Sequence, residues 1–148
     1  MEAPPRVDAK AAGDYLAVMT RAVFQGGISW SVVNAKWDGI QRAFHGFDAE
    51  RVAELTEPEL DEIAANPEVI RNRRKIEATV SNAARLLELE VEYGSFGAYL
   101  DSLTDYDAKV KALRKHFKFL GETGCYFFLY VVGQDVPPHD EWRRSQET

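Results

Sequence analysis

Apolar residues recur along this chain at the three- and four-residue spacing that is typical of helices. Leu16, Met19 and Val23 form the first such stripe, which predicts a helix that Asp8 could cap and that ends near Phe24. No segment of the sequence shows the clear alternation of apolar and polar positions that marks a strand. The pattern therefore predicts an all-α chain of eight or nine short helices joined by short turns.

Capping residues predict where several of these helices begin. Ser29 is expected to cap a second helix whose first turn carries Trp30, and Asp48 is expected to cap a fourth. Thr56 followed three residues later by Glu59 is a capping box, and the proline between them suits a first turn. The other predicted helices are a short third one carrying residues 40–47, and then 68–93, 95–103, 105–116 and 123–132. The final segment, residues 133–148, contains two prolines and is predicted to be mostly loop.

Residues 112–132 have the pattern of a basic helix, a tight turn and an apolar helix. Gly121 could take backbone angles closed to other residues and let another chain approach closely. Thr123 is the expected N-cap, which would leave the amides of Gly124 and Cys125 free to bind a phosphate. Three residues just upstream could meet the same anion: Lys115, His116 and Lys118. Two interpretations stay open, a helix-hairpin-helix that holds a DNA backbone and an ordinary αα-hairpin with a glycine turn.

Length and composition limit the class of protein. The chain has 148 residues, of which 45% are hydrophobic, so a single domain over residues 1–148 with a real core is expected. Residues 1–7 and about 140–148 are predicted to be loose tails. The sequence has no apolar run long enough to cross a bilayer and no signal-peptide core, which predicts a cytoplasmic protein without a membrane partner. The single cysteine, Cys125, excludes an internal disulfide and is expected to pack in the core.

Charge is distributed unevenly on a chain whose net charge is −6. Nine of the 18 lysines and arginines fall in two clusters, within residues 71–75 and 109–118. The net acidity argues against a general nucleic-acid binder, whereas a local basic face fits a protein that grips a short piece of duplex. Two solvated helix faces would explain the clusters equally well. Four residues of the first cluster could serve either DNA contact or ion pairing: Arg71, Arg73, Arg74 and Lys75.

Several short segments follow one another in an order that matches a known family. The first is QGGISW at residues 25–30, and the next are RAF at 42–44, FD at 47–48 and VA at 52–53. IRNRRKI at 70–76 is followed by NA at 82–83, and the last is FKFLG at 117–121 with Thr123, Cys125 and Tyr126. Together they resemble the DNA 3-methyladenine glycosylase I family of the helix-hairpin-helix glycosylases, whose own first segment reads QAGLSW.

This resemblance implies a compact multi-helix domain of the helix-hairpin-helix DNA glycosylase type. No cofactor is expected. Such a protein acts in base excision repair: it flips a damaged base out of double-stranded DNA and cleaves the N-glycosidic bond, here of alkylated purines of the 3-methyladenine class. A monomer is expected to bind the damaged duplex. Trp30 falls on the tryptophan that stacks on the excised base, with a plain core residue as the alternative, and Phe24 and Gln25 lie beside it. Trp37 and Trp142 are expected to be packing residues. The expected DNA-binding residues are Lys118, Leu120, Gly121, Glu122, Thr123 and Gly124.

Three departures from the family pattern bear on activity. The family holds zinc with cysteine and histidine residues from both ends of its chain, and this sequence has no such set, so no metal is expected. The family's base-recognising glutamate, eight residues before the tryptophan, is Ala22 here, and alanine cannot accept a hydrogen bond. If His139 is the anchor, Pro137 replaces the catalytic aspartate of the wider superfamily. The nearby candidate catalytic carboxylates are Asp135, Asp140 and Glu141. The alternative function is therefore a scaffold that has lost catalysis and binds damaged or distorted DNA.

Overall fold

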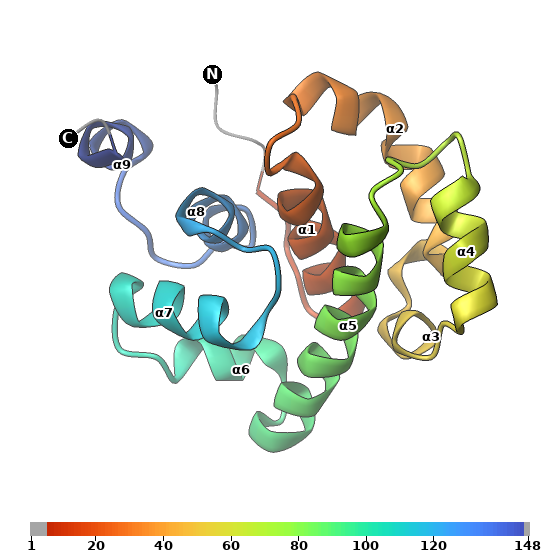
Figure 1. Cartoon of the computed structure of the whole chain (residues 1–148). Helices are drawn as coiled ribbons and strands as arrows, with labels where there is room; N and C mark the ends of the chain where they lie inside the picture. Colours follow the sequence, from red (N-terminus) through yellow and green to blue (C-terminus); the bar gives the residue numbers. More distant parts are fainter. Residues whose placement is uncertain (1–5, 147–148) are drawn as a thin grey trace.

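The computed structural model describes residues 6–146, and the regular structure among them is helical without any strand, as the sequence predicts (Figure 1). In this part of the chain no helix is long and apolar enough to cross a membrane. The elements are α1 (Ala12–Gln25), α2 (Trp30–Ala43), the 3-10 helix η1 (His45–Phe47), α3 (Ala49–Ala53), α4 (Glu57–Ala65), α5 (Arg73–Tyr93), α6 (Phe96–Asp101), α7 (Tyr106–His116), α8 (Glu122–Val131) and α9 (His139–Gln146).

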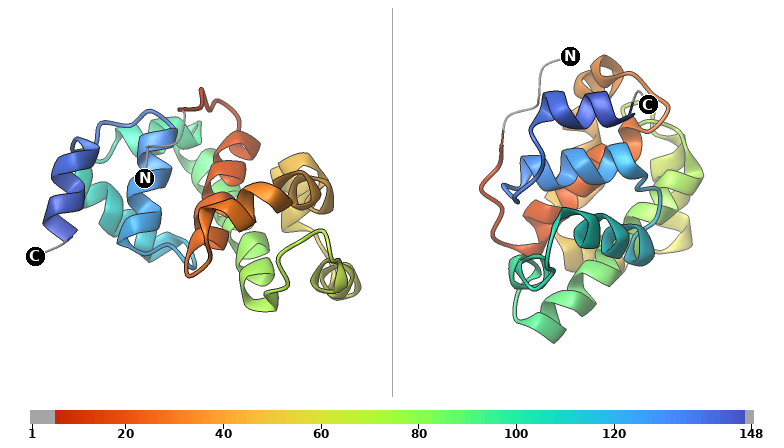
Figure 2. Two further views of the ribbon diagram at one scale, coloured as in Figure 1. Left: turned by 90° about the horizontal axis from the view of Figure 1, so that it is seen from above. Right: turned by 90° about the vertical axis from the view of Figure 1, so that its left-hand side faces the viewer.

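Helices α1 and α5 pack against each other at the centre of the molecule. Helices α2, α3 and α4 lie on one side of this pair, and α6 to α9 lie on the other (Figure 1). On the second side α9 lies beside α8, which in turn lies beside α7 (Figure 2). Because α1 also packs against α8, the central helix connects the two sides.

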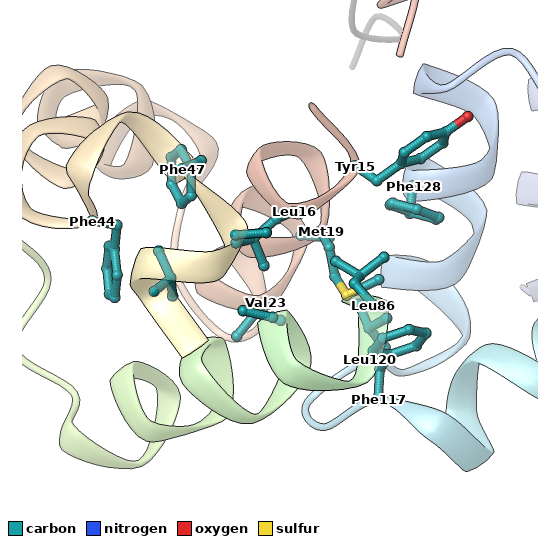
Figure 3. Close-up of a cluster of buried hydrophobic side chains, with 14 of the residues drawn as sticks. Tyr15, Leu16, Met19, Val23, Phe44, Phe47, Leu86, Phe117, Leu120 and Phe128 are labelled. Carbon is teal, nitrogen blue, oxygen red and sulfur yellow. The ribbon is translucent and has the colours of Figure 1, made fainter. Parts of the chain in front are cut away.

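One hydrophobic core surrounds α1 and extends from the side of α2 and α3 to the side of α7 and α8 (Figure 3). The predicted stripe of Leu16, Met19 and Val23 is completely buried in it. Phe44 closes the core on the α2 side, and Phe117 closes it on the α7 side. The helical periodicity of the sequence therefore identified the correct inward face of α1.

Three predicted helix caps are confirmed. Ser29 Oγ accepts from the amide of Val32 at 3.4 Å and starts α2, and the Asp48 carboxylate likewise starts α3. At α4 the capping box is complete, because the Glu59 amide donates to Thr56 Oγ1 while Glu59 Oε1 accepts from the Thr56 amide. These helix starts depend on contacts within four residues, which the sequence displays directly.

Two predicted helix boundaries are wrong near the start of the chain. Asp8 does not cap α1; the helix begins after Ala11, whose amide donates to Asp14 Oδ2 at 3.0 Å. The short third helix does not exist as a separate element, because α2 continues through Ile40 to Ala43. Gly39 lies inside α2 for a tertiary reason: a Cβ there would lie 2.5 Å from the backbone oxygen of Glu68.

The long helix α5 starts later than the sequence predicts. Asn72 is its N-cap and accepts from the Lys75 amide at 3.2 Å, so residues 68–72 are not helical. Gly94 follows the last residue of α5 with φ of 91°, which is the expected helix end.

The predicted loose tails are wrong within the described residues. Residues 139–146 form α9, and Trp142 stacks on Tyr126 with 4.3 Å between ring centroids and 15° between planes. At the other end the Val7 amide donates to Val131 O at 2.7 Å. Trp142 is thus a packing residue, as expected. Its burial stabilises α9 in a segment that was predicted to be mostly loop because of its two prolines. The rest of the predicted tails, residues 1–5 and 147–148, lies outside the described residues.

Candidate nucleic-acid interface

The connection between α7 and α8 exposes backbone amides at a helix start. Gly121 is the N-cap of α8, so the prediction of Thr123 as N-cap is wrong. The Cys125 amide is not free either, because it donates to Gly121 O at 2.9 Å. The amides without a partner inside the helix are therefore those of Glu122, Thr123 and Gly124. Together with the helix dipole they form a site that suits a phosphate group.

Gly121 does not have the unusual backbone angles that the sequence analysis allowed for it. Its φ of −86° is open to any residue, which corrects the conformational argument for a glycine here. The left-handed angle belongs to Phe119, at φ 60°. A Cβ added to Gly121 would meet no described atom within 4 Å, and the residue is exposed. The space in front of the first turn of α8 is thus open to an approaching strand.

Asn82, on α5, fixes the turn in place. The Lys118 amide donates to Asn82 Oδ1 at 2.8 Å, and Asn82 Nδ2 donates to Lys118 O at 3.2 Å. Asn82 is 1% exposed, whereas the side chain of Lys118 points into solvent. Leu120, predicted to contact DNA, is instead buried in the core and anchors the turn from below. The sequence comparison had marked Asn82 only as part of a family segment.

His116 does not supply positive charge to the hairpin, which corrects its predicted role. Its Nδ1 accepts from Arg85 Nε at 3.1 Å. Burial, and after it the charge of Arg85, lowers the pKa of His116 below its ordinary value. The ring is therefore a neutral acceptor at the end of α7 at pH 7.

The basic residues at the start of α5 divide into two kinds. Arg73 pairs with three carboxylates: Glu57, Asp61 and Glu77. Lys75 is 6% exposed and donates from Nζ to Gly26 O, which holds the loop that leads into α2. These two side chains are structural.

The other two basic residues of this segment remain exposed. Arg74 lies with its guanidinium carbon 5.7 Å from the ring centroid of Phe119, which is 44% exposed beside the hairpin turn. Arg71 is exposed just before α5 begins. The geometry therefore joins Arg74 to the hairpin, a neighbourhood that sequence spacing alone did not reveal.

A cavity of about 480 Å³ lies between α1, α2 and α8. Trp30 lines it from the first turn of α2, and Trp37 lines it two turns later, in addition to stacking on Phe47 at 5.4 Å. Gln25 also lines the cavity. Phe24 does not: it is completely buried in the core on the other face of α1, which corrects its predicted place in the pocket.

Arg21 is the cavity residue that the sequence analysis missed. Its guanidinium carbon lies 5.1 Å from the ring centroid of Trp30 and 4.7 Å from that of Trp37. Its Nη2 donates to Asn34 Oδ1. Burial lowers the pKa of Arg21 from its ordinary value, but an arginine side chain stays protonated in proteins. One signal was available, because Arg21 precedes Gln25 by one helical turn and must share its face of α1.

The predicted catalytic carboxylates do not line this cavity. Asp135 and Asp140 are exposed, and Glu141 lines a separate hollow between α7 and α9. The carboxylate that does line the cavity is Asp14, which lies seven residues before Arg21, about 10 Å along the helix. Its Oδ2 accepts from the amides at the start of α1.

The side chains of the described residues do not form a zinc site. Among residues 6–146, no three His, Cys, Asp or Glu side chains are grouped to hold a metal. Cys125 packs in the core as expected, and burial raises the pKa of its thiol to about 12, so it is no thiolate ligand.

Helix α8 links the hairpin to the cavity. A Cβ built on Gly124, in its first turn, would lie 3.9 Å from Ala22 Cβ. Ala22 lines the cavity from α1, and Phe127 and Phe128 line it from the next turn of α8. The amides that suit a phosphate and the hollow beside Trp30 therefore lie about one helical turn apart along the same helix.

Comparison with known proteins agrees with this arrangement. The profile of the methyladenine glycosylase family matches residues 14–116. DNA-3-methyladenine glycosylase from Haemophilus influenzae is 32% identical over 74% of this chain and 70% of its own, and DNA-3-methyladenine glycosylase 1 from Escherichia coli is 31% identical over the same shares. A crystal structure of 3-methyladenine DNA glycosylase I is 31% identical with a TM-score of 0.73, over 86% of this chain and 81% of that one.

The structural similarity covers more of the chain than the matched profile does. The Staphylococcus aureus 3-methyladenine DNA glycosylase I covers 90% of this chain with 83% of its own, at a TM-score of 0.77 and 25% identity. The matched profile and the identity to the two bacterial relatives show that the chain belongs to the methyladenine glycosylase family.

Proposed function

We propose that this protein is a DNA N-glycosylase of base excision repair that removes alkylated purines, the 3-methyladenine class, by flipping the base into the cavity beside Trp30. The observation that carries the proposal is the single helix α8, which presents free amides in its first turn and walls the aromatic cavity in its next. The relatives are named for this activity, and one solved relative is a complex with 3-methyladenine.

The proposed reaction begins at the DNA backbone. A phosphate binds the amides of Glu122 and Thr123, and the exposed Lys118 and Arg74 add positive charge beside them. Extruding a nucleotide costs a few kcal/mol, least where a damaged base is poorly paired. The held backbone and the nearby cavity together favour the flipped state.

Chemistry at the flipped base needs little help from acids or bases. A purine that is alkylated while still joined to its sugar is cationic and is already an activated leaving group. Stacking on the Trp30 indole supplies part of the binding free energy, of the order of 1–3 kcal/mol per base. Such a mechanism is compatible with Ala22 in place of the family's glutamate. It is also compatible with Asp14 as the carboxylate of the cavity.

The proposal includes a monomer that acts on double-stranded DNA in the cytoplasm. Its test is incubation with methylated duplex DNA, followed by chromatography of the released bases. We expect release of 3-methyladenine above the spontaneous rate. A folded wild-type protein that releases no base above background would refute the enzymatic proposal.

One observation favours a second function, a glycosylase scaffold that binds damaged DNA without cutting it. The Arg21 guanidinium already lies over Trp30, where an excised base is expected to stack. This function predicts tighter binding to abasic duplex than to normal duplex, together with no base release. Equal affinity for the two duplexes would remove it.

A further inference from the structure

A hollow of about 830 Å³ lies between α7 and α9, separate from the cavity beside Trp30. Helix α8 lies between α9 and α1 (Figure 1), so the hollow and the cavity are on different sides of α8. Trp142 of α9 lines the hollow and stacks on Tyr126 of α8, which fixes α9 as one wall. Charged side chains also line it: Asp107, Lys111, Arg114, Lys115, Glu122 and Glu141.

The end of the hollow nearest the hairpin is basic. Arg114 and Lys115 are in the last turn of α7. Asp107 and Glu141 are in the first turns of α7 and α9. Because both of these helices end on the side where α8 begins (Figure 2, right), the two carboxylates lie at the far end of the hollow. The carboxylate near the hairpin, Glu122, pairs with Arg114 at 3.5 Å, which offsets its charge.

Two amines at the hollow are available to bind phosphates. Lys111 and Lys115 are exposed, and their four-residue spacing puts them on one face of α7. Among residues 6–146, neither lysine side chain has an ion pair or a hydrogen bond. Four residues of helix rise about 6 Å, and a DNA strand adds a nucleotide about every 3.4 Å along the axis, so the two amines span about two nucleotides. This spacing suits phosphates that follow one another along a strand better than a single anion.

The hollow continues the surface of the hairpin. Glu122 lines the hollow, and its amide is one of the free amides in the first turn of α8. A strand whose phosphate lies on these amides has the cavity beside Trp30 on one side and the hollow on the other. We propose that the hollow between α7 and α9 holds the sugar-phosphate strand as it leaves the hairpin, with Lys111 and Lys115 on the neighbouring phosphates. The inference rests on the proposed function only in taking the hairpin as a DNA-binding site.

The first test measures duplex affinity against salt for Lys111→Gln and Lys115→Gln. Each lost phosphate contact should make the slope of log affinity against log salt shallower by about 0.9 and lower the affinity roughly eightfold near 0.1 M salt. Arg51→Gln is the matched control, because it removes the same charge from an exposed position on α3, on the other side of the molecule, and should keep the wild-type slope. Fluorescence anisotropy with a labelled undamaged duplex gives slope and affinity, and urea unfolding shows that the variants are folded.

The second test blocks the hollow without changing its charge. Ser145→Trp puts a bulky neutral side chain on the α9 wall, which should exclude the strand and reproduce the weaker affinity and shallower slope of the lysine variants. Deoxyadenosine monophosphate is added separately as a free phosphate ligand. At a concentration equal to that of the duplex in nucleotides, it should not displace the duplex.

Unchanged slopes in both lysine variants, an equal change in Arg51→Gln, or wild-type affinity in Ser145→Trp would overturn the inference. Displacement of the duplex by the free mononucleotide would also overturn it, because the hollow would then be a site for a small phosphate ligand. Base release from methylated duplex is measured beside these affinities. Release with unchanged lysine slopes refutes the inference and supports the proposed function. Lysine-dependent slopes without release support the inference and refute the enzymatic proposal.

Discussion

The hairpin and the base cavity share helix α8 but depend on different chemistry. At the hairpin the groups available to DNA are backbone amides of Glu122 and Thr123, and Asn82 holds the turn from behind. In the cavity the available groups are side chains, with Arg21 and Gln25 as the buried donors. One region thus uses groups that every residue carries, and the other uses groups that a single substitution removes.

This difference indicates which property of the protein can change easily. Docking on a sugar-phosphate strand survives most substitutions in the turn, provided that the turn keeps its position. Recognition of a base depends on a few side-chain atoms, so single substitutions in the cavity are expected to change it more than substitutions in the turn. Relatives of one fold can therefore share a DNA grip and differ in the lesion they remove.

The largest expected effect comes from breaking the clamp of the hairpin. Asn82→Ala removes both hydrogen bonds between the Asn82 side chain and the Lys118 backbone. The amide and carbonyl of Lys118 are then left without these partners. We expect the free energy of unfolding to fall by about 2–3 kcal/mol and duplex affinity to fall with it. Urea unfolding and fluorescence anisotropy with a labelled duplex measure the two changes.

Thr56→Ala is the matched control for Asn82→Ala. It removes the cap of α4, away from the hairpin, and should cost about 1 kcal/mol of stability. Its duplex affinity should stay at the wild-type value. If Asn82→Ala also kept wild-type affinity, the turn would not depend on the clamp.

In the cavity the largest effect is expected from Trp30→Ala. The loss of a stacking platform worth about 1–3 kcal/mol should slow base release by roughly fivefold to 160-fold. Affinity for undamaged duplex should change little, because the hairpin is intact. Chromatography of released bases measures the first and anisotropy the second. Trp30→Phe keeps an aromatic face and should retain most of the release; equal release by Trp30→Ala would exclude stacking.

A smaller effect is expected from Gly121→Ala at the open face of the hairpin. Its backbone angles suit alanine and the added Cβ meets open space, so stability should change by less than about 0.5 kcal/mol. The methyl group would face an approaching phosphate, so duplex affinity should fall roughly two- to fivefold, about the loss of one weakened hydrogen bond. Because no charge is removed, the slope of affinity against salt should stay constant. Unchanged affinity would mean that no strand approaches here.

The smallest effect is a pH dependence at the end of α7. The folded-state pKa of His116 is below its ordinary value of 6.5, so the unfolded chain binds more protons between the two values. This contribution to stability is complete above pH 6.5 and is lost as the pH falls towards the folded-state pKa. Urea unfolding at pH 7 and pH 5.5 should show a steeper acid loss for the wild type than for His116→Gln. Identical losses would contradict the neutral role of His116.

Elements that depend on near neighbours could be predicted from the sequence. The inward stripe of Leu16, Met19 and Val23 follows from spacing alone, and the caps at Ser29 and Thr56 need only the next turn. The family segments likewise indicated Trp30 and the hairpin as separate features. These predictions do not say which segments that are distant in the sequence contact each other in the fold.

The parts that could not be predicted depend on tertiary contacts. A separate short helix over residues 40–47 was predicted, yet α2 continues to Ala43, and Gly39 within it allows close packing against Glu68. Helix α9 is held in place by the stacking of Trp142 on Tyr126. This contact joins two separate helices, so no local sequence pattern predicts it. The place of Arg21 beside the rings of Trp30 and Trp37 depends on how α1 and α2 cross, so the sequence indicated only that Arg21 shares a face of α1 with Gln25.

The two ends of the described chain both rest on α8. Near the N-terminus the amide of Val7 donates to Val131 and the guanidinium of Arg6 lies over Tyr130, while Trp142 from α9 covers Tyr126. An affinity tag or fusion partner at either terminus could therefore disturb α8, the helix whose first-turn amides we propose as the phosphate site. Tag-free protein is the appropriate reference for any measured affinity.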